Sequence, residues 1–389
     1  MVFVFSVCCL LTSLVLSFLI IPLLIDLLTK KGVLDVGGRR KIHKGKKPSM
    51  GGVAIFAGFM FSSLAWVPWS EVAYFRYFFI GMILMFLTGL YDDRLDLKAK
   101  YKFIVQVLIA VLVVWGGGEK GIRVPPCAFD EFFGTHALSG TWRTVFNYLW
   151  PVMSYATSIF LIVGVVNAFN LIDGFDGLAG TIGIISFTLL AVWLLAVGDT
   201  QNHGWSMGLM LVALVGGVAA FLYHNWQPST IFMGDTGSLT LGFILAVSIL
   251  KFMQINSDPD FVSDFRANAP VSMGCAFAIV PIFDTLRIFA VRISKGRSPF
   301  SPDKLHIHHL LSRSMKLAHW QIAMFMGALH LLLMALIFLL ARILPDFLLI
   351  ILIILICVGL HFLLGRVINL TFFASKWREK RRKKESRRR

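Results

Sequence analysis

Eleven apolar stretches of about twenty residues restrict what this chain can fold into. They cover residues 3–25, 51–68, 76–92, 101–116, 146–166, 177–197, 205–223, 237–254, 271–292, 319–341 and 347–366. A bilayer-spanning helix needs about 20 such residues, because its backbone must satisfy its own hydrogen bonds in hydrocarbon. Only 15% of the residues are charged, against about 25% in soluble domains. The sequence therefore predicts an all-α polytopic membrane bundle of about eleven transmembrane helices, and excludes a soluble or disordered protein.

The basic residues predict the orientation of this bundle. Of the 37 Lys and Arg residues, 29 lie in the connections and tail on one side, and seven lie on the other. Because basic loops stay in the cytoplasm, we expect the N-terminus outside and the C-terminus inside. We expect one transmembrane domain, 1–370, and a basic cytoplasmic tail, 371–389. The tail follows an apolar span directly, so its charge indicates anionic lipid headgroups and not nucleic acid.

Carboxylates gather at the predicted cytoplasmic ends of the spans, where they are costly to place and usually functional. The first group contains Asp92, Asp93 and Asp96. Asp92 and Asp96 stand at i and i+4, on one helix face, while adjacent aspartates point about 100° apart. Lys102 follows closely and could offset their repulsion. The alternative is an ordinary solvated helix end.

The segment 167–180 concentrates amides, carboxylates and glycines, among them Asn170, Asp173 and Asp176. Such a segment suits a loop whose backbone approaches a ligand closely. Its oxygens are the hard ligands that Mg²⁺ takes together with phosphate. Asp235 opens a later span, where a helix N-terminus favours anions. The alternatives are a plain Asx/Gly turn for the segment and an N-cap for Asp235.

A fourth motif runs from Lys295 to His309 and contains Arg297, His306, His308 and His309. The histidine spacing lacks the separation of structural zinc sites. Phosphate binding by imidazole and guanidinium groups fits better, with zinc or a structural loop as the alternatives. Within the span 271–292, we expect Asp284 and Arg287 to form a buried structural pair.

Taken together, residues 30–310 resemble the polyprenyl-phosphate N-acetylhexosamine-1-phosphate transferase family, and are most similar to its bacterial undecaprenyl-phosphate GlcNAc-1-phosphate transferases. The resemblance implies a multi-pass protein of the bacterial inner membrane with a cytoplasmic active site. It implies transfer of GlcNAc-1-phosphate from UDP-GlcNAc to undecaprenyl phosphate with release of UMP, an early membrane step of cell-envelope polysaccharide assembly. The implied cofactor is Mg²⁺, with Mn²⁺ as the alternative, and a homodimer is left open.

The family's functional positions map onto this sequence by resemblance. Asp92 and Asp93 resemble the catalytic aspartate pair, and Lys102 the residue that holds the lipid phosphate. The Mg²⁺ positions match Asn170 and Asp235. Positions around the nucleotide match Asp173, Asp176, Asn225 and Phe232. The loop that holds the sugar diphosphate matches Arg297, His306, His308 and His309. The pentapeptide transferases differ, having Lys at the position of Asp96 and an uninterrupted histidine run.

The charges of the implied reaction favour direct attack. A phosphate monoester is mostly dianionic at pH 7, so the acceptor needs little help from a general base. Double displacement through an aspartyl-phosphate is the alternative. Two other functions stay open: the same chemistry with another UDP-HexNAc donor, and an ion-coupled membrane transporter. The transporter predicts acidic residues near the bilayer midplane and inverted repeats.

Overall fold

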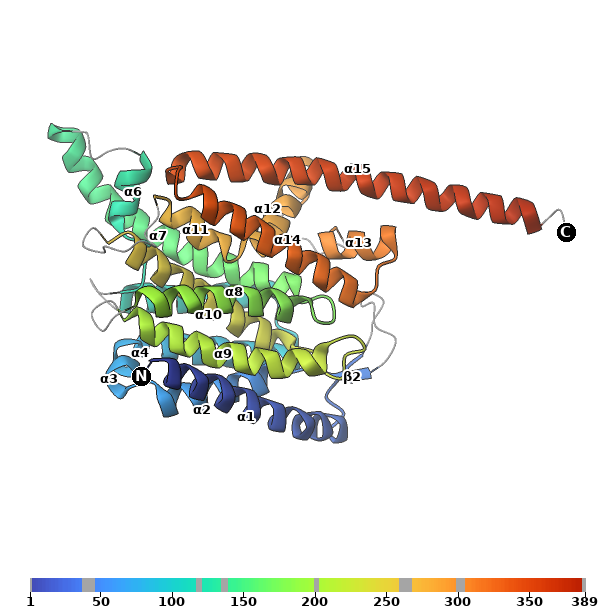
Figure 1. Ribbon diagram of the computed structural model, residues 1–389, viewed down its shortest axis with the longest axis horizontal. Coiled ribbons are helices and arrows are strands. Elements are labelled where there is room, and N and C mark those ends of the chain that lie inside the picture. The colour runs from blue at the N-terminus through green and yellow to red at the C-terminus, as the bar shows by residue number, and fades with distance from the viewer. Residues whose placement is uncertain are drawn as a thin grey trace.

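The computed structural model describes residues 2–36, 46–116, 121–133, 139–198, 203–258, 268–298 and 305–386. The chain order is α1 (Val2–Lys30), β1 (Leu34–Val36), β2 (Lys46–Pro48), α2 (Gly52–Trp66), α3 (Trp69–Tyr74), α4 (Arg76–Leu95), α5 (Ala99–Gly116), α6 (Pro126–Phe133), α7 (Gly140–Ile172), α8 (Leu178–Val197), α9 (Gly204–Asn225), α10 (Gly234–Asn256), α11 (Pro270–Ala276), α12 (Ile279–Ser294), α13 (Ile307–Met315), α14 (His319–Leu340) and α15 (Asp346–Ser386). The long helices run side by side as a bundle (Figure 1). The all-α prediction is confirmed, apart from one small hairpin.

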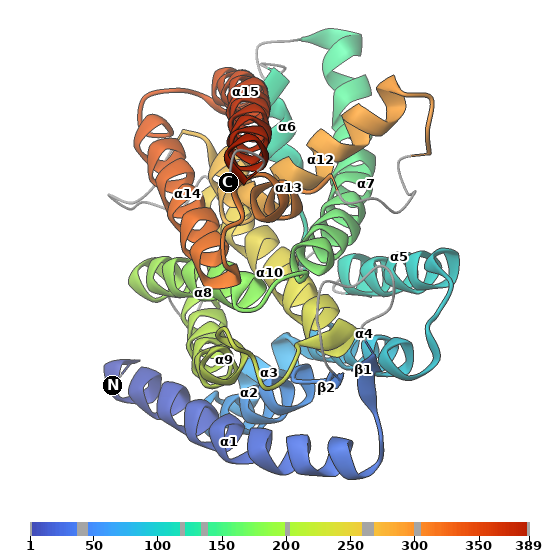
Figure 2. The same ribbon diagram turned by 90° about the vertical axis from the view of Figure 1, so that its right-hand side faces the viewer.

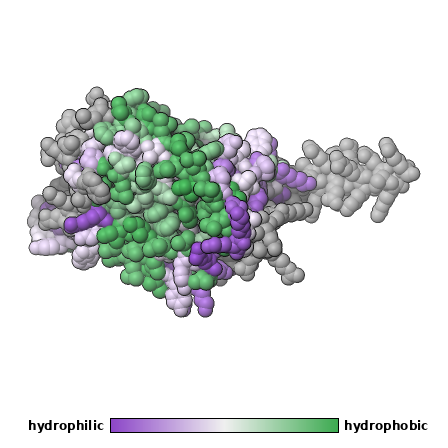
Figure 3. Space-filling view, turned by 90° about the horizontal axis from the view of Figure 1, so that it is seen from below, coloured by the Kyte–Doolittle hydropathy of each residue, from purple (hydrophilic) through white to green (hydrophobic). Residues whose placement is uncertain are grey.

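The bundle is a multi-pass membrane protein by the length and apolar character of its helices. Within the described ranges, eight helices are long and apolar enough to cross a bilayer, or nine if one bent pair counts as a span. Each predicted span coincides with a helix or with that pair. Figure 3 shows apolar side chains forming a broad belt across the middle of one face. The count of eleven and the orientation stay predictions.

Helix α10 forms the centre of the bundle, as the view along the long axis shows (Figure 2). Of its most apolar window, 94% is buried inside the protein. It packs against α4, α7, α2 and α8. A helix that is apolar on all sides is expected in such a core position. Its first turn thereby becomes the point on which several other helices converge.

The predicted span over residues 271–292 coincides with a bent pair of helices. This segment forms α11 and α12, which meet at an angle of 88°. The break falls at Phe277 and Ala278, and Pro281 lies in the first turn of α12. Proline lacks an N–H, and its ring clashes with the carbonyl four residues earlier, here that of Phe277. The helix therefore restarts in a new direction.

The hairpin of β1 and β2 is fastened to the loop between α9 and α10. The strands pair antiparallel, with Asp35 opposite Lys47. Phe232 donates its N–H to the carbonyl of Pro48 at 2.9 Å and accepts from Gly51 at 2.8 Å. The basic residues 39–44 lie outside the described residues. The hairpin and the loop before α10 lie at the same end of the bundle, named the site end below (Figure 1).

Helix α15 runs unbroken past residue 370, from Asp346 to Ser386. It extends beyond the body of the bundle at the site end, while the N-terminus lies at the opposite end (Figure 1). The division into residues 1–370 and a tail of 371–389 stays a prediction.

Candidate active site

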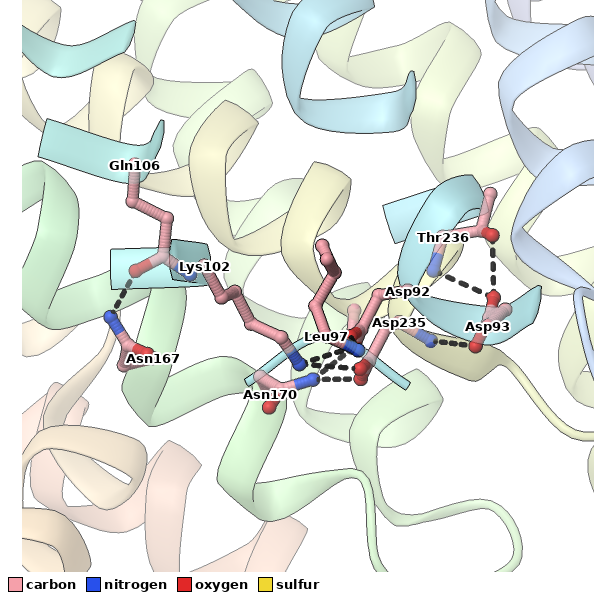
Figure 4. Close-up of polar contacts among 10 residues, drawn as sticks. Asp92, Asp93, Leu97, Lys102, Gln106, Asn167, Asn170, Asp235 and Thr236 are labelled. Carbon is pink, nitrogen blue, oxygen red and sulfur yellow. Dashed lines mark hydrogen bonds and ion pairs between the residues drawn. The ribbon is translucent and has the colours of Figure 1, made fainter. Parts of the chain in front are cut away.

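The ammonium of Lys102 connects carboxylates from two other helices (Figure 4). It forms ion pairs with Asp92 of α4 and with Asp235 of α10, the latter at 2.7 Å between Nζ and Oδ2. The Lys102 and Asp92 side chains are 18% and 5% exposed. Such pairs are held strongly because losing one partner would leave a buried charge uncompensated. The structure thus brings together three predicted residues, of which Asp235 is more than 130 positions from the others.

Helix α7 brings Asn170 into the same cluster. Its Nδ2 donates to Asp235 and, at 2.7 Å, to Oγ of Ser238. One turn earlier, Asn167 donates to Oε1 of Gln106 at 2.6 Å. Gln106 was not predicted, although a polar residue inside an apolar span, four positions after Lys102, is a signal that could have found it. Helices α4, α5, α7 and α10 thus each contribute a polar side chain to the cluster.

Asp93 has different partners from Asp92, as the 100° offset of adjacent helical residues requires. Its carboxylate accepts the backbone N–H groups of Asp235 and Thr236 at 2.8 and 3.0 Å, and the Thr236 hydroxyl at 2.5 Å. The N-terminal N–H groups of a helix have no partner in the helix itself and favour an anion. Asp93 therefore caps α10 from another helix, and Asp235 is not the N-cap.

The expected shared face of Asp92 and Asp96 is wrong. Helix α4 ends at Leu95, and Asp96 takes a left-handed conformation with φ of 49°. It is exposed. Asp92 instead accepts the N–H of Leu97 at 2.8 Å, which ties down the turn into α5.

Two aspartates with opposite electrostatic environments lie in the loop after α7. Burial raises the pKa of Asp173 well above its usual range, and so do the negative charges of Asp235, Asp93 and Asp176. Burial also acts to raise the pKa of Asp176, but a hydrogen bond and the charge of His319 outweigh it and lower that pKa. The Asp176 and His319 side chains approach to 3.4 Å. Asp173 therefore favours its protonated form, whereas Asp176 favours its ionised form.

Asn225 links the loop after α7 to the loop before α10. Its Oδ1 accepts the Gly177 N–H, and its Nδ2 donates to the Ile231 carbonyl, both at 2.8 Å. The Asn225 residue is 4% exposed. Because both ends of the amide are engaged with backbone, Asn225 holds the two loops together, and its predicted place at the nucleotide stays a prediction.

Phe232 lies in this second loop with a cation over its ring. The Lys47 ammonium is 5.3 Å from the ring centroid. It donates to Oγ of Ser229 at 3.0 Å. Sequence reasoning missed Lys47 as a site residue, because its contact depends on the hairpin's attachment 180 residues away.

The predicted buried pair of Asp284 and Arg287 is present and also anchors the histidine motif. The two side chains pair at 2.8 Å. The second Asp284 oxygen binds Nδ1 of His306, also at 2.8 Å. Asp284 further accepts the Ile307 N–H at 3.1 Å, at the start of α13. One carboxylate on α12 therefore fixes where α13 begins.

Helix α13 presents His308 and His309 to the loop after α7. The Phe175 ring lies 5.1 Å from His308 and 5.3 Å from His309. His308 is 1% exposed, and both of its ring nitrogens lack a hydrogen-bond partner among the described residues. A Cβ built on Gly174 would lie 3.1 Å from its Nε2. Burial lowers the pKa of His308 to about 3, so the ring is neutral.

Arg297 is not brought to this cluster by the described contacts. It is exposed just after α12, where its backbone N–H bonds the Arg292 carbonyl at 2.9 Å. Residues 299–304, the middle of the predicted diphosphate loop, lie outside the described residues. Its predicted role stays a prediction.

The donor set fits a magnesium ion. Asp92, Asp235 and Asn170 are carboxylate and amide groups that converge where Lys102 supplies positive charge. Among the described residues, no group of three His, Cys, Asp or Glu forms a complete metal cage. Mg²⁺ takes only one or two protein carboxylates and completes its shell with water and phosphate. Two carboxylates and one amide beside the Lys102 ammonium match that preference.

Comparison with known proteins agrees with the family resemblance found in the sequence. Residues 75–253 match the family model described as glycosyl transferase family 4. A Bacillus subtilis protein named a probable undecaprenyl-phosphate N-acetylglucosaminyl 1-phosphate transferase is 34% identical, over 77% of this chain and 75% of its own length. A Yersinia pestis undecaprenyl-phosphate alpha-N-acetylglucosaminyl 1-phosphate transferase is 31% identical, over 73% and 71%. A Mycolicibacterium smegmatis decaprenyl-phosphate N-acetylglucosaminephosphotransferase is 32% identical, over 72% and 68%. The chain therefore belongs to glycosyl transferase family 4, among the polyprenyl-phosphate N-acetylhexosamine-1-phosphate transferases.

Proposed function

We propose that this protein transfers GlcNAc-1-phosphate from UDP-GlcNAc to undecaprenyl phosphate and releases UMP. The observation that carries the proposal is the Lys102 ammonium between Asp92 and Asp235, at the ends of membrane helices. A phosphate on a lipid reaches that position without leaving the membrane boundary. The names of the relatives support the same reaction.

Each charged group has a role in this scheme. Lys102 binds the acceptor phosphate, with Asp92 and Asp235 fixing its ammonium. Bound Mg²⁺, held by Asp235 and Asn170, would neutralise the diphosphate of the donor. His308, neutral and buried, offers a hydrogen bond to a phosphate oxygen near Gly174. Asp173 and Asp176 lie on the nucleotide side, next to the Phe232 loop.

The acceptor phosphate attacks the donor directly in this scheme. Phosphate monoesters are mostly dianionic at pH 7, so little proton removal is needed. Asp93 is engaged in capping α10, which makes it a support for Asp235. An aspartyl-phosphate intermediate, the alternative, would be trapped by incubating the protein with UDP-GlcNAc and no lipid.

The site faces the cytoplasm of the bacterial inner membrane, where UDP-sugars are found. The distribution of Lys and Arg supports this placement, since most of them lie on the side of Asp92 and Asp235. Labelling of single cysteines by a membrane-impermeant reagent in sealed vesicles tests it.

Radiolabelled UDP-GlcNAc, added to membranes with and without EDTA, tests the function. We expect label in the organic phase, lost with EDTA and restored by Mg²⁺, with Mn²⁺ as a second ion to try. Label that accumulates inside vesicles as intact UDP-GlcNAc would instead indicate a transporter, an alternative that the relatives do not support. A panel of UDP-HexNAc donors identifies the sugar.

A further inference from the structure

His319 is the first residue of α14, which begins at the site end (Figure 1). Its Nδ1 lies 3.4 Å from the carboxylate oxygen Oδ2 of Asp176 and 3.4 Å from the backbone nitrogen of the same aspartate. A ring nitrogen accepts a hydrogen bond when it is unprotonated and donates one when it is protonated. In either state, His319 therefore has a partner on Asp176, at its N–H or at its carboxylate.

The ring of His319 also packs on the neighbour of Asp176 in the loop after α7. Its centroid lies 4.5 Å from that of the Phe175 ring, and the two planes are inclined at 59°. The His319 and Asp176 side chains are only 16% and 5% exposed, so the contact is largely shielded from water. A nitrogen and a ring face of one side chain therefore both attach this loop to α14.

The next residue of α14 binds the other loop of the predicted nucleotide region. The Trp320 N–H, which has no partner within its own helix, donates to Oε1 of Gln227 at 3.1 Å. Gln227 belongs to the loop before α10. One turn further along α14, the Ala323 Cβ would lie 3.8 Å from a Cβ built on Gly177. The first turn of α14 thus contacts both loops.

The Asp176 carboxylate has one oxygen beside His319 and a second that is unpartnered. Oδ1 is buried and has no hydrogen-bond partner among the described residues. Leaving a buried acceptor unsatisfied costs about 1–3 kcal/mol, so this oxygen indicates a donor that a ligand brings. The ribose and base of a uridine nucleotide carry O–H and N–H donors, whereas a carboxylate repels the phosphates. The orientation of Asp176 therefore bears on nucleotide binding.

We propose that His319 is a positioning residue for the donor nucleotide, and that it holds the Asp176 carboxylate so that Oδ1 accepts a hydrogen bond from the ribose or the base. This inference rests on the proposed function, which supplies the nucleotide. A carboxylate that is already oriented loses less conformational freedom when the ligand binds. Because His319 acts only through Asp176, it contributes to binding of the donor, and not to binding of the acceptor phosphate at Lys102.

Substitutions that separate the nitrogen of His319 from its ring test the proposal by kinetics. His319→Asn keeps a nitrogen near the position of Nδ1 and loses the ring, whereas His319→Phe keeps the ring and loses the nitrogen. We expect the KM for UDP-GlcNAc to rise about tenfold in the Phe variant and less than about threefold in the Asn variant. In both variants, kcat and the KM for undecaprenyl phosphate should change less than about twofold.

His203→Phe is the matched control for a general loss of stability. Nδ1 of His203 pairs with Glu71 at 2.7 Å, and the two side chains are 24% and 9% exposed. This pair lies at the beginning of α9, at the opposite end of the bundle (Figure 1). We expect this variant to melt at a lower temperature with an unchanged KM for UDP-GlcNAc. If His319→Phe does not fold, His319→Gln replaces it, because its amide lies beyond the position of Nδ1.

Calorimetric titration of the purified full-length protein with UMP and Mg²⁺ gives a readout that does not require turnover. We expect the Kd for UMP to rise about tenfold in His319→Phe, and to rise no further when His319→Phe is added to Asp176→Asn, because the two residues act as a unit. Additive losses in the double variant, or an Asn variant as impaired as the Phe variant, would overturn the positioning role alone. A wild-type protein that binds UMP but transfers no sugar phosphate to a prenyl phosphate would overturn the proposed function itself.

Discussion

The carboxylate of Asp93 accepts the backbone N–H of Asp235 at 2.8 Å, although 142 positions separate the two residues. Through this bond, the end of α4 holds the beginning of α10. The neighbouring Asp92 is also linked to Asp235, because both carboxylates pair with the ammonium of Lys102. Of these two adjacent aspartates, Asp93 therefore caps α10, and Asp92 belongs to the candidate active site.

Asp93→Ala should remove this cap. We expect a loss of about 0.5–2 kcal/mol of stability, typical of a lost N-cap, and a lower kcat because Asp235 is no longer held. Asp96→Ala is the control, since Asp96 is exposed beyond the end of α4. Thermal unfolding in detergent and transfer assays measure both effects. Equal behaviour of the two variants would contradict the capping role.

Lys102→Met should remove the only described positive charge between Asp92 and Asp235. We expect kcat/KM to fall by about 10²–10³-fold, the cost typical of losing a preorganised charge contact in an active site. Lys102→Arg keeps the charge but changes its geometry, so its loss should be smaller. Acceptor-dependent kinetics check the order, and an Arg variant as inactive as the Met variant would argue for shape over charge.

Gly89→Ala should separate α4 from α10. A Cβ at Gly89 would lie 2.4 Å from the Asp235 carbonyl oxygen and 2.6 Å from Thr236 Cα, both backbone atoms that cannot move independently. Overpacking of this kind costs about 1–3 kcal/mol. Gly359→Ala on α15 is the matched control, because its Cβ would meet nothing within 4 Å. We expect only the first variant to lose thermal stability and activity, and unaffected transfer by Gly89→Ala would contradict the close contact.

His308 should make stability depend on pH. Burial lowers its pKa to about 3 in the folded protein, against about 6.5 in an unfolded chain. The unfolded state therefore binds more protons between these values, so stability is full above about pH 6.5 and falls as the pH decreases toward 3, by up to about 1.4 kcal/mol per unit. Melting temperatures measured from pH 7.5 to 5 should fall less steeply in His308→Asn. An unchanged slope in that variant would contradict the prediction.

Local patterns were enough to predict the helices, because hydropathy and span length are properties of neighbouring residues. They also placed Asp92, Lys102, Asn170 and Asp235 at one membrane boundary, and the structure brings these four together. The break in 271–292 was missed because a hydropathy window does not register the clash of Pro281 with the fourth carbonyl before it.

The partners of the site residues could not be predicted from spacing. Asp284 was assigned to a local pair with Arg287, which exists, but its bond to His306 crosses 22 positions. The 100° offset separated Asp93 from Asp92 in the sequence, but it did not identify the N–H groups of α10 as the partners of Asp93. Lys47 reaches Ser229 only because the hairpin bonds to the Phe232 backbone. Each case depends on a long-range contact, which the sequence does not encode locally.

Because α15 is unbroken, it determines where a reporter protein fused to its end would lie. Past Arg366, the end of its apolar span, the helix continues to Ser386. Those roughly 20 residues rise about 30 Å, so a fluorescent protein attached there is held away from the bilayer surface by a rod and does not crowd substrate entry. The N-terminus lies at the opposite end of the bundle (Figure 1). With the orientation predicted from the basic residues, one chain tagged at both ends would report both faces of a vesicle at once.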